Sequence, residues 1–106
     1  GDVEVIIYTK GTNGAEFITK ERVIFSPSFK VSAQDTTGAG DSFIGSLLYQ
    51  VAEGEYSLEE LVTLSEEKVQ EILTFSNATA ALTVCKKGAI GALPLKEEVL
   101  AKISER

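Results

Sequence analysis

The stretch that most constrains this chain covers residues 34–46, QDTTGAGDSFIGS, where a glycine-rich loop runs directly into an apolar helical pattern. Gly38 and Gly40 carry no Cβ atom, so a ligand can approach the main chain closely there. A helix that begins near Asp41 leaves the amides just before it without intrahelical acceptors, and the helix dipole favours a negative charge beside them. The stretch therefore predicts an anion-binding site at a helix start.

Asp41 adds a carboxylate at the rim of this predicted anion site. A carboxylate there can accept a proton from a hydroxyl that attacks a bound phosphate. Together the two features fit phosphoryl transfer, in which catalysis is mostly positioning and charge neutralisation. The residues leave one alternative open, in which Asp41 only caps the helix and the glycines only form a turn. The pattern has neither the lysine of a Walker A loop nor the spacing of a dinucleotide-binding fingerprint.

Apolar periodicity and turn signals predict three strands followed by helices. We expect strands over 3–10, 15–20 and 22–29, and helices over 41–54, 57–64, 65–88 and 95–103. The first strand is nearly continuous in apolar character, which predicts burial on both faces. Such a strand needs neighbours, so the chain is either a small α+β domain or the C-terminal part of a larger sheet, and we favour the larger sheet.

Charge and composition exclude several kinds of site. The net charge is −6, and the basic residues form no long run, which argues against non-specific binding of nucleic acid. The sequence contains no histidine and one cysteine, so histidine-dependent catalysis and an internal disulfide are excluded within it. The longest apolar runs are too short to span a bilayer, and no segment resembles a signal peptide. We expect a cytoplasmic protein without membrane or nucleic-acid partners.

The string DTTGAGDSF at residues 35–43 closely resembles the C-terminal signature of the ribokinase-like sugar kinases, the PfkB carbohydrate kinase family. Residues 5–17 resemble the strand–turn–strand of that family that borders the nucleotide, and residues 75–94 resemble its late adenine-side helix and loop. The resemblance covers essentially the whole chain. It implies that residues 1–106 are the C-terminal, nucleotide-binding and catalytic-base portion of a three-layer α/β/α fold, without the N-terminal sugar-binding and lid portion.

The resemblance also implies roles for individual residues. Asp41 would be the base that deprotonates the primary hydroxyl of a sugar, and the backbone at Gly38, Ala39 and Gly40 would form the anion hole for the γ-phosphate. The residues implied to border ATP are Thr9, Gly11, Gly14 and Asn77. Some family members bind a monovalent cation, mostly through main-chain oxygens, and the candidates by position are Asp35, Thr37, Thr83, Lys86, Gly88 and Ala92.

By resemblance, the activity is ATP- and Mg²⁺-dependent phosphorylation of a sugar, with K⁺ as a further candidate cofactor. The pattern looks most like fructokinases, while ribokinase, 2-keto-3-deoxygluconate kinase and nucleoside kinase stay open. Alternatives are a non-catalytic nucleotide-sensing domain and a structural fragment that dimerises through its first strand. Lys10 stands where many members have leucine, and we expect it to face solvent rather than a phosphate. We expect this chain to be inactive alone, and to form homo-oligomers through its bare sheet edge.

Overall fold

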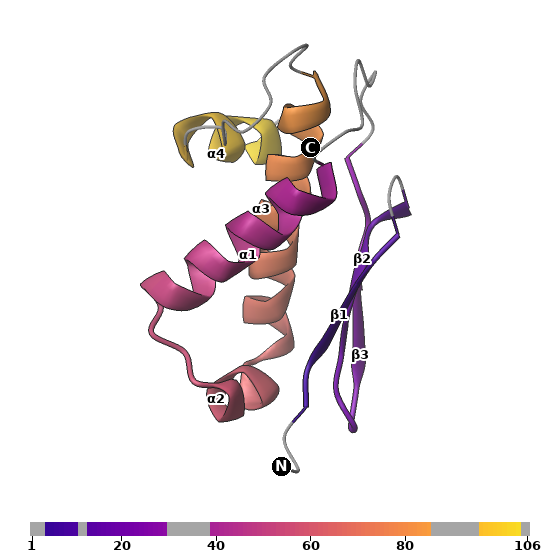
Figure 1. The fold of residues 1–106 in the computed structure, drawn as a ribbon, viewed down its shortest axis with the longest axis vertical. Helices are drawn as coiled ribbons and strands as arrows, with labels where there is room; N and C mark the ends of the chain where they lie inside the picture. The colour runs from indigo at the N-terminus through magenta and orange to yellow at the C-terminus, as the bar shows by residue number, and fades with distance from the viewer. Residues whose placement is uncertain (1–3, 11–12, 30–38, 86–95, 105–106) are drawn as a thin grey trace.

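The structure is a computed structural model that describes residues 4–10, 13–29, 39–85 and 96–104. Its elements follow the predicted order, three strands and then helices (Figure 1). They are β1 (Ile6–Thr9), β2 (Ala15–Ile18), β3 (Val23–Ser26), α1 (Ala39–Glu53), α2 (Leu58–Thr63), α3 (Glu66–Cys85) and α4 (Lys96–Ser104). The mixed α/β class is confirmed, and in this part of the chain the helices cover one face of the sheet (Figure 1).

The sheet is antiparallel throughout, in the order β1-β2-β3. Side chains alternate between its two faces, so residues directly opposite one another share a face. Phe17 lies opposite Ile7 on β1 and Ile24 on β3, and this row faces the helices. Phe17 and Ile24 are each 4% exposed and form the core with Leu73 and Val69 of α3. The sheet therefore supplies one wall of the core and α3 supplies the other.

The prediction that the first strand is buried on both faces is wrong for the described residues. Ile6 is 47% exposed and Tyr8 55% exposed, on the face that points away from the helices. β1 stands at the end of the strand order, and the described helices all lie across the other face (Figure 1). An apolar strand sequence predicts burial, but exposure depends on which layers are present.

Lys10 lies on this outer face of the sheet. Its ammonium is 3.3 Å from a carboxylate oxygen of Glu16, and it stands 5.8 Å from the ring centre of Tyr8 and 5.7 Å from that of Phe25. Lysine interacts favourably with aromatic faces and carboxylates at such distances. Lys10 is therefore engaged with the sheet surface, and the expectation that it faces solvent rather than a phosphate stays a prediction.

Helix α1 packs along α3 through the side that carries Phe43, which is 3% exposed and joins the core. Leu47 and Val51 of α1 are half-buried, whereas Leu48 is 61% exposed and Ile44 40% exposed. These two residues lie one turn apart on the side of α1 that no described element covers.

The short helix α2 begins with a capping box, a signal that the sequence SLEE at residues 57–60 carries. The Ser57 hydroxyl accepts a hydrogen bond from the Glu60 amide, and the Glu60 carboxylate accepts one from the Ser57 amide. This hydrogen bond from the Ser57 amide lowers the pKa of the exposed Glu60 carboxyl. None of the helices in the described ranges is long and apolar enough to cross a membrane.

Arg22 joins the turn between β2 and β3 to the end of α2. Its guanidinium donates to the carbonyl of Val62 at 3.0 Å and to that of Leu64, and it lies over the ring of Phe17. Carbonyls at a helix C-terminus have no intrahelical donor, so a cation there is favourable. Arg22 thus anchors the lower end of the sheet in Figure 1 to the helices.

Replacing Arg22 should therefore weaken the fold from outside the core. We expect Arg22→Ala to lower the free energy of unfolding by about 1–3 kcal/mol, because carbonyls at the end of α2 lose their charged donor. Exposed Lys20 in the same turn is the control, and Lys20→Ala should change it by less than about 0.5 kcal/mol. Urea denaturation measures both, and equal losses would contradict the anchoring role of Arg22.

Candidate active site at the start of α1

The predicted anion site falls on the first turn of α1, which begins at Ala39. The first amides of a helix have no acceptor within the helix, so those of this turn point outward from its end. A Cβ atom built on Gly40 would meet nothing within 4 Å, so the space beside this main chain is open. Gly38 lies outside the described residues.

Asp41 is exposed in this first turn. Asp41 takes part in neither the Lys10–Glu16 nor the Lys68–Glu71 ion pair of the described residues. Its carboxylate is therefore in solvent beside the open main chain at Gly40. This arrangement can receive an anion on the helix amides and a proton on the carboxylate, which is the chemistry that the sequence predicts.

Four other predicted site residues lie at the same end of the molecule: Thr9, Gly14, Asn77 and Thr83. The register pairs Thr9 with Ala15 and Ala15 with Ser26, so β1 and β3 end there and β2 begins there. Helix α1 runs antiparallel to α3, and this brings the start of α1 beside the last turn of α3 (Figure 1). The structure therefore gathers the ends of β1, β3 and α3 around the start of α1.

Gly14 is buried and must be glycine for reasons internal to the fold. Its φ of 108° is in the left-handed region, which side chains with a Cβ rarely adopt. A Cβ there would stand 2.9 Å from the Cα of Pro27 and closer still to the carbonyl oxygen of Ser26. Gly14 therefore lets the turn after β1 lie directly against the end of β3.

Asn77 approaches the same end of β3 from α3. Its side-chain amide donates to the carbonyl of Ser26 at 3.3 Å, to the Ser26 hydroxyl at 3.2 Å and to the carbonyl of Pro27 at 3.3 Å. Asn77 is 4% exposed, so its side-chain amide is buried and its hydrogen bonds stabilise the fold. Its expected place beside a nucleotide stays a prediction.

The candidate cation ligands are mostly beyond the described residues. Thr83 lies in the last turn of α3, where carbonyls lack an intrahelical donor, and its hydroxyl donates to the carbonyl of Thr79 at 2.9 Å. A main-chain role for Thr83 is thus compatible with its position and stays a prediction. Besides Gly38, the predicted site residues outside the described ranges are Gly11, Asp35, Thr37, Lys86, Gly88 and Ala92.

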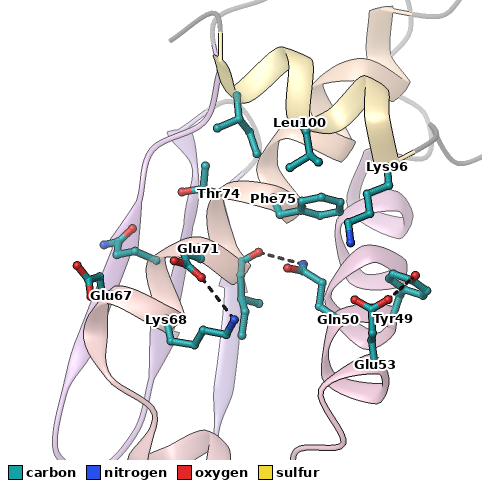
Figure 2. Close-up of a pocket in the computed structure, with 13 residues that line it drawn as sticks. Tyr49, Gln50, Glu53, Glu67, Lys68, Glu71, Thr74, Phe75, Lys96 and Leu100 are labelled. Atoms are coloured by element: carbon teal, nitrogen blue, oxygen red, sulfur yellow. Dashed lines mark hydrogen bonds and ion pairs between the residues drawn. The ribbon is translucent and has the colours of Figure 1, made fainter.

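A cavity of about 600 Å³ lies between α1, α3 and α4, and none of the predicted site residues lines it. Figure 2 shows Phe75 and Leu100 on one side of it and Gln50 and Tyr49 on the other. The hydroxyl of Tyr49 donates to Glu53 at 2.8 Å, and this bond raises the pKa of the tyrosine. This cavity is therefore separate from the start of α1.

Sequence reasoning missed the part played by Ser26, which is fully buried and meets both Gly14 and Asn77. Its signal would have been a serine on the alternating, inward face of a strand otherwise lined by apolar residues. No group of three or more acidic or cysteine side chains in the described ranges could hold a metal ion.

Comparisons with known proteins agree with this arrangement. The pfkB family of carbohydrate kinases matches residues 1–96. The probable fructokinase-2 of Arabidopsis thaliana is 43% identical over 100 residues, which are 94% of this chain and 29% of that protein. A crystal structure of fructokinase with bound ATP from Xylella fastidiosa covers 95% of this chain and 32% of its own, with a TM-score of 0.85 and 31% identity. Ribokinase from Thermotoga maritima covers 95% of this chain and 30% of its own, with a TM-score of 0.73 and 32% identity.

These matches define a ribokinase-like fold, and the chain belongs to the pfkB family of carbohydrate kinases. The resemblance read from the glycine-rich loop is confirmed. The chain spans about 29% of the length of its Arabidopsis relative. The roles of individual residues stay predictions.

The two described glycines of the predicted site should respond oppositely to alanine. We expect Gly14→Ala to lower the free energy of unfolding by about 1–3 kcal/mol, because the left-handed backbone and the contact with Ser26 both resist a Cβ. Gly40→Ala should leave it unchanged or raise it by up to about 1 kcal/mol, because its Cβ is unobstructed in a helix. Thermal unfolding of both variants tests this, and a stable Gly14→Ala protein would contradict the close packing against β3.

Proposed function

We propose that this chain is the nucleotide-binding and catalytic-base portion of an ATP-dependent, fructokinase-like sugar kinase. The observation that carries the proposal is the exposed Asp41 carboxylate in the first turn of a 15-residue helix, beside the open main chain at Gly40. Membership of the carbohydrate kinase family supports the same reaction class.

In the proposed reaction, the primary hydroxyl oxygen of the sugar attacks the γ-phosphorus of ATP. A bond forms between them as the bond to the leaving ADP oxygen breaks, and the hydroxyl proton passes to Asp41. Amides at Gly38, Ala39 and Gly40 stabilise the charge on the transferred phosphoryl group, and the dipole of α1 adds to them. Because the carboxylate of Asp41 pairs with no described cation, it is free to take the proton.

On the nucleotide side, we assign Thr9, Gly11, Gly14 and Asn77 to the border of ATP. Thr9 is exposed at the end of β1, at the same end of the molecule as Asp41. Gly14 and Asn77 meet at the end of β3, so their contribution is to shape this border rather than to present free side-chain donors. ATP in the crystal structure of the Xylella fastidiosa fructokinase supports a nucleotide in this fold.

Mg²⁺ and a monovalent cation such as K⁺ are part of the proposal. Mg²⁺ on the phosphates would supply neutralisation of the charge that develops during transfer. Described residues provide no cluster of acidic side chains for it, so its remaining ligands come from ATP, water or other parts of the protein. For the monovalent cation the candidates are the main-chain oxygens and carboxylate at Asp35, Thr37, Thr83, Lys86, Gly88 and Ala92.

We favour fructose as the sugar, because fructokinases are among the relatives and solved structures most similar to this chain. Ribokinase is the second candidate, supported by the similarity to the Thermotoga maritima enzyme. A 2-keto-3-deoxygluconate kinase is a third. The chain spans less than a third of its relative, so we propose that the sugar pocket lies elsewhere in a longer, cytoplasmic protein and that this portion alone does not turn over.

The base assignment is tested by Asp41→Asn in the full-length protein that contains this chain. We expect kcat for phosphorylation of the sugar to fall by about 10²–10⁴-fold, because the transferred proton loses its acceptor. Affinity for ATP should stay similar, since the amides of the helix start are retained. Coupled detection of ADP release with fructose, ribose and 2-keto-3-deoxygluconate measures turnover and identifies the substrate. Turnover that survives the substitution would contradict the base role.

Gly40→Ala tests the anion site separately from the base. A methyl group in the open space beside the helix start should hinder the γ-phosphate, and we expect kcat to fall by about 10²–10³-fold, as when one oxyanion donor is lost. The fold is expected to be as stable as the parent or more so, and this separates lost activity from lost structure. Full activity in this variant would mean that the glycine serves only the turn.

A parent protein that binds ATP but releases no ADP with any of these sugars would favour the nucleotide-sensing alternative. In that case Asp41→Asn should keep or strengthen nucleotide binding, because a negative charge beside the phosphates is removed.

A further inference from the structure

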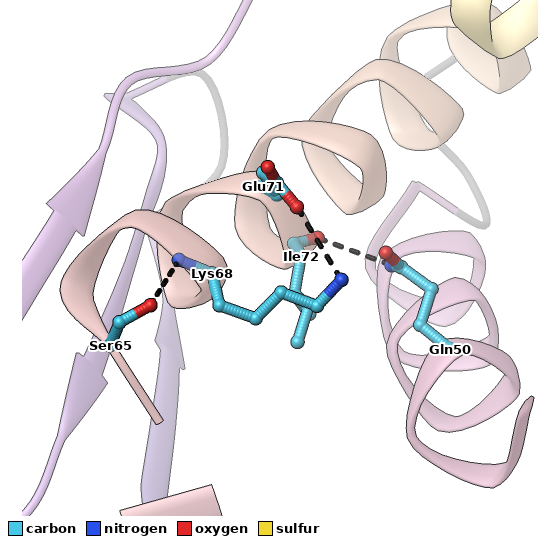
Figure 3. Close-up of polar contacts among 5 residues, drawn as sticks. All are labelled: Gln50, Ser65, Lys68, Glu71 and Ile72. Carbon is cyan, nitrogen blue, oxygen red and sulfur yellow. Dashed lines mark hydrogen bonds and ion pairs between the residues drawn. The ribbon is translucent and has the colours of Figure 1, made fainter. Parts of the chain in front are cut away.

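Four polar residues form a row of hydrogen bonds between α1 and α3: Ser46, Gln50, Ser76 and Thr79. This polar seam has no part in the function as stated so far. Gln50 of α1 directs its side-chain amide at α3, where the nitrogen lies 3.0 Å from the Ser76 hydroxyl and 3.2 Å from the carbonyl of Ile72. Figure 3 shows Gln50 reaching across from α1 to this carbonyl. The same nitrogen is 3.3 Å from the carbonyl of Ser46, one turn back along α1.

A second contact lies one turn nearer to Asp41. The hydroxyls of Ser46 and Thr79 are 3.2 Å apart, and both residues are buried, at 4% and 3% exposed. Ser76 is fully buried, and its hydroxyl also donates to the carbonyl of Ile72 at 2.9 Å. The polar groups of the seam therefore find their hydrogen-bond partners within the protein. Every buried side-chain nitrogen and oxygen of the described residues has such a partner.

The hydrogen bonds of the polar seam depend on direction, whereas the apolar contacts between α1 and α3 do not. Burial of Phe43 stabilises the pairing of α1 with α3 but tolerates small sliding or rotation, because the hydrophobic effect depends on area rather than on angle. Hydrogen bonds weaken steeply away from their preferred distances and angles. Gln50 and Ser46 therefore define the position of α1 along its axis and its rotation about that axis.

Asp41 lies on the same helix, two and a half turns before Gln50 by the helical repeat of about 3.6 residues. An α-helix transmits a shift at one turn to the next, so the register set at Gln50 is also the register of the first turn. We propose that Gln50, supported by the Ser46–Thr79 contact, is a positioning residue that holds the Asp41 carboxylate and the helix-start amides in line with the transferred phosphoryl group. This inference rests on the proposed function of Asp41.

The test uses Gln50→Leu in the full-length protein. Leucine fills similar space but donates no hydrogen bond, and Ser76 keeps its bond to the carbonyl of Ile72, so the fold should persist. A misplacement of about 1 Å can cost roughly 10²-fold in rate, so we expect kcat to fall by about 10- to 100-fold. KM for ATP should change by less than about threefold, because the loss falls on the reacting geometry.

The matched control is Gln70→Leu. Gln70 on α3 also donates its side-chain amide to a distant carbonyl, that of Phe25 at 2.7 Å, which belongs to β3 rather than to a helix. Melting temperatures should fall by similar small amounts in the two variants, while kcat should fall only in Gln50→Leu. Equal kcat values for the two proteins would overturn the positioning role.

Two further measurements separate this inference from the base assignment. In an Asp41→Asn background, Gln50→Leu should cause no additional loss of kcat, whereas an undiminished additional loss would show that Gln50 acts by another route. A crystal structure of Gln50→Leu, superposed on α3, should show the first turn of α1 displaced, and an unmoved first turn would overturn the inference. A parent protein that shows no turnover contradicts the proposed function instead, and the crystal structure then still decides whether Gln50 sets the register.

Discussion

The hydrogen bonds of the Asn77 side chain at the end of β3 join the sheet to the helices at the end of the molecule where the candidate site lies. The same point of β3 receives Gly14 from the turn after β1, in a backbone conformation that glycine adopts freely. Ser26 is therefore held from two sides, by α3 and by the β1–β2 turn. Residues that resemblance assigns to the nucleotide border also hold the layers of the fold together, so shape and binding cannot be separated at these positions.

The two edge strands of the sheet, β1 and β3, have different neighbours. Along β3, the side-chain amide of Gln70 on α3 donates to the carbonyl of Phe25, which by the strand register points away from β2 at that edge. β1 is the other end of the strand order, and in the described ranges no strand lies beyond it. A sheet can grow by adding a strand at an open edge, and β1 offers such an edge. This is consistent with a chain that covers about 29% of its relative.

Features that depend on neighbours in sequence were predictable. The order of strands and helices, the capping box at Ser57 and the burial of Ser76 on the inner face of α3 follow from local periodicity and hydrogen bonding. Features that depend on distant packing were not. The exposure of Leu48 and of β1 reflects which layers are present, and the pairing of Gln50 with α3 reflects a helix contact between residues that are 26 apart along the chain. For the site, the loop motif predicted Asp41, while the polar seam around Gln50 became visible only in the fold.

The fold constrains Gly14 and Gly40 of the candidate site differently, and this difference bears on function. Gly14 is explained within the chain, because its positive φ and its approach to Ser26 exclude a side chain. Gly40 has neither constraint: it stands in a helix, has open space where a Cβ would be, and alanine would favour that helix by about 0.8–1.0 kcal/mol. Packing and backbone geometry in the described part of the chain therefore give no reason for glycine at Gly40. A ligand that must come close to the amides at the start of α1 does give one, and the neighbouring carboxylate of Asp41 fits a ligand that is to be attacked by a hydroxyl.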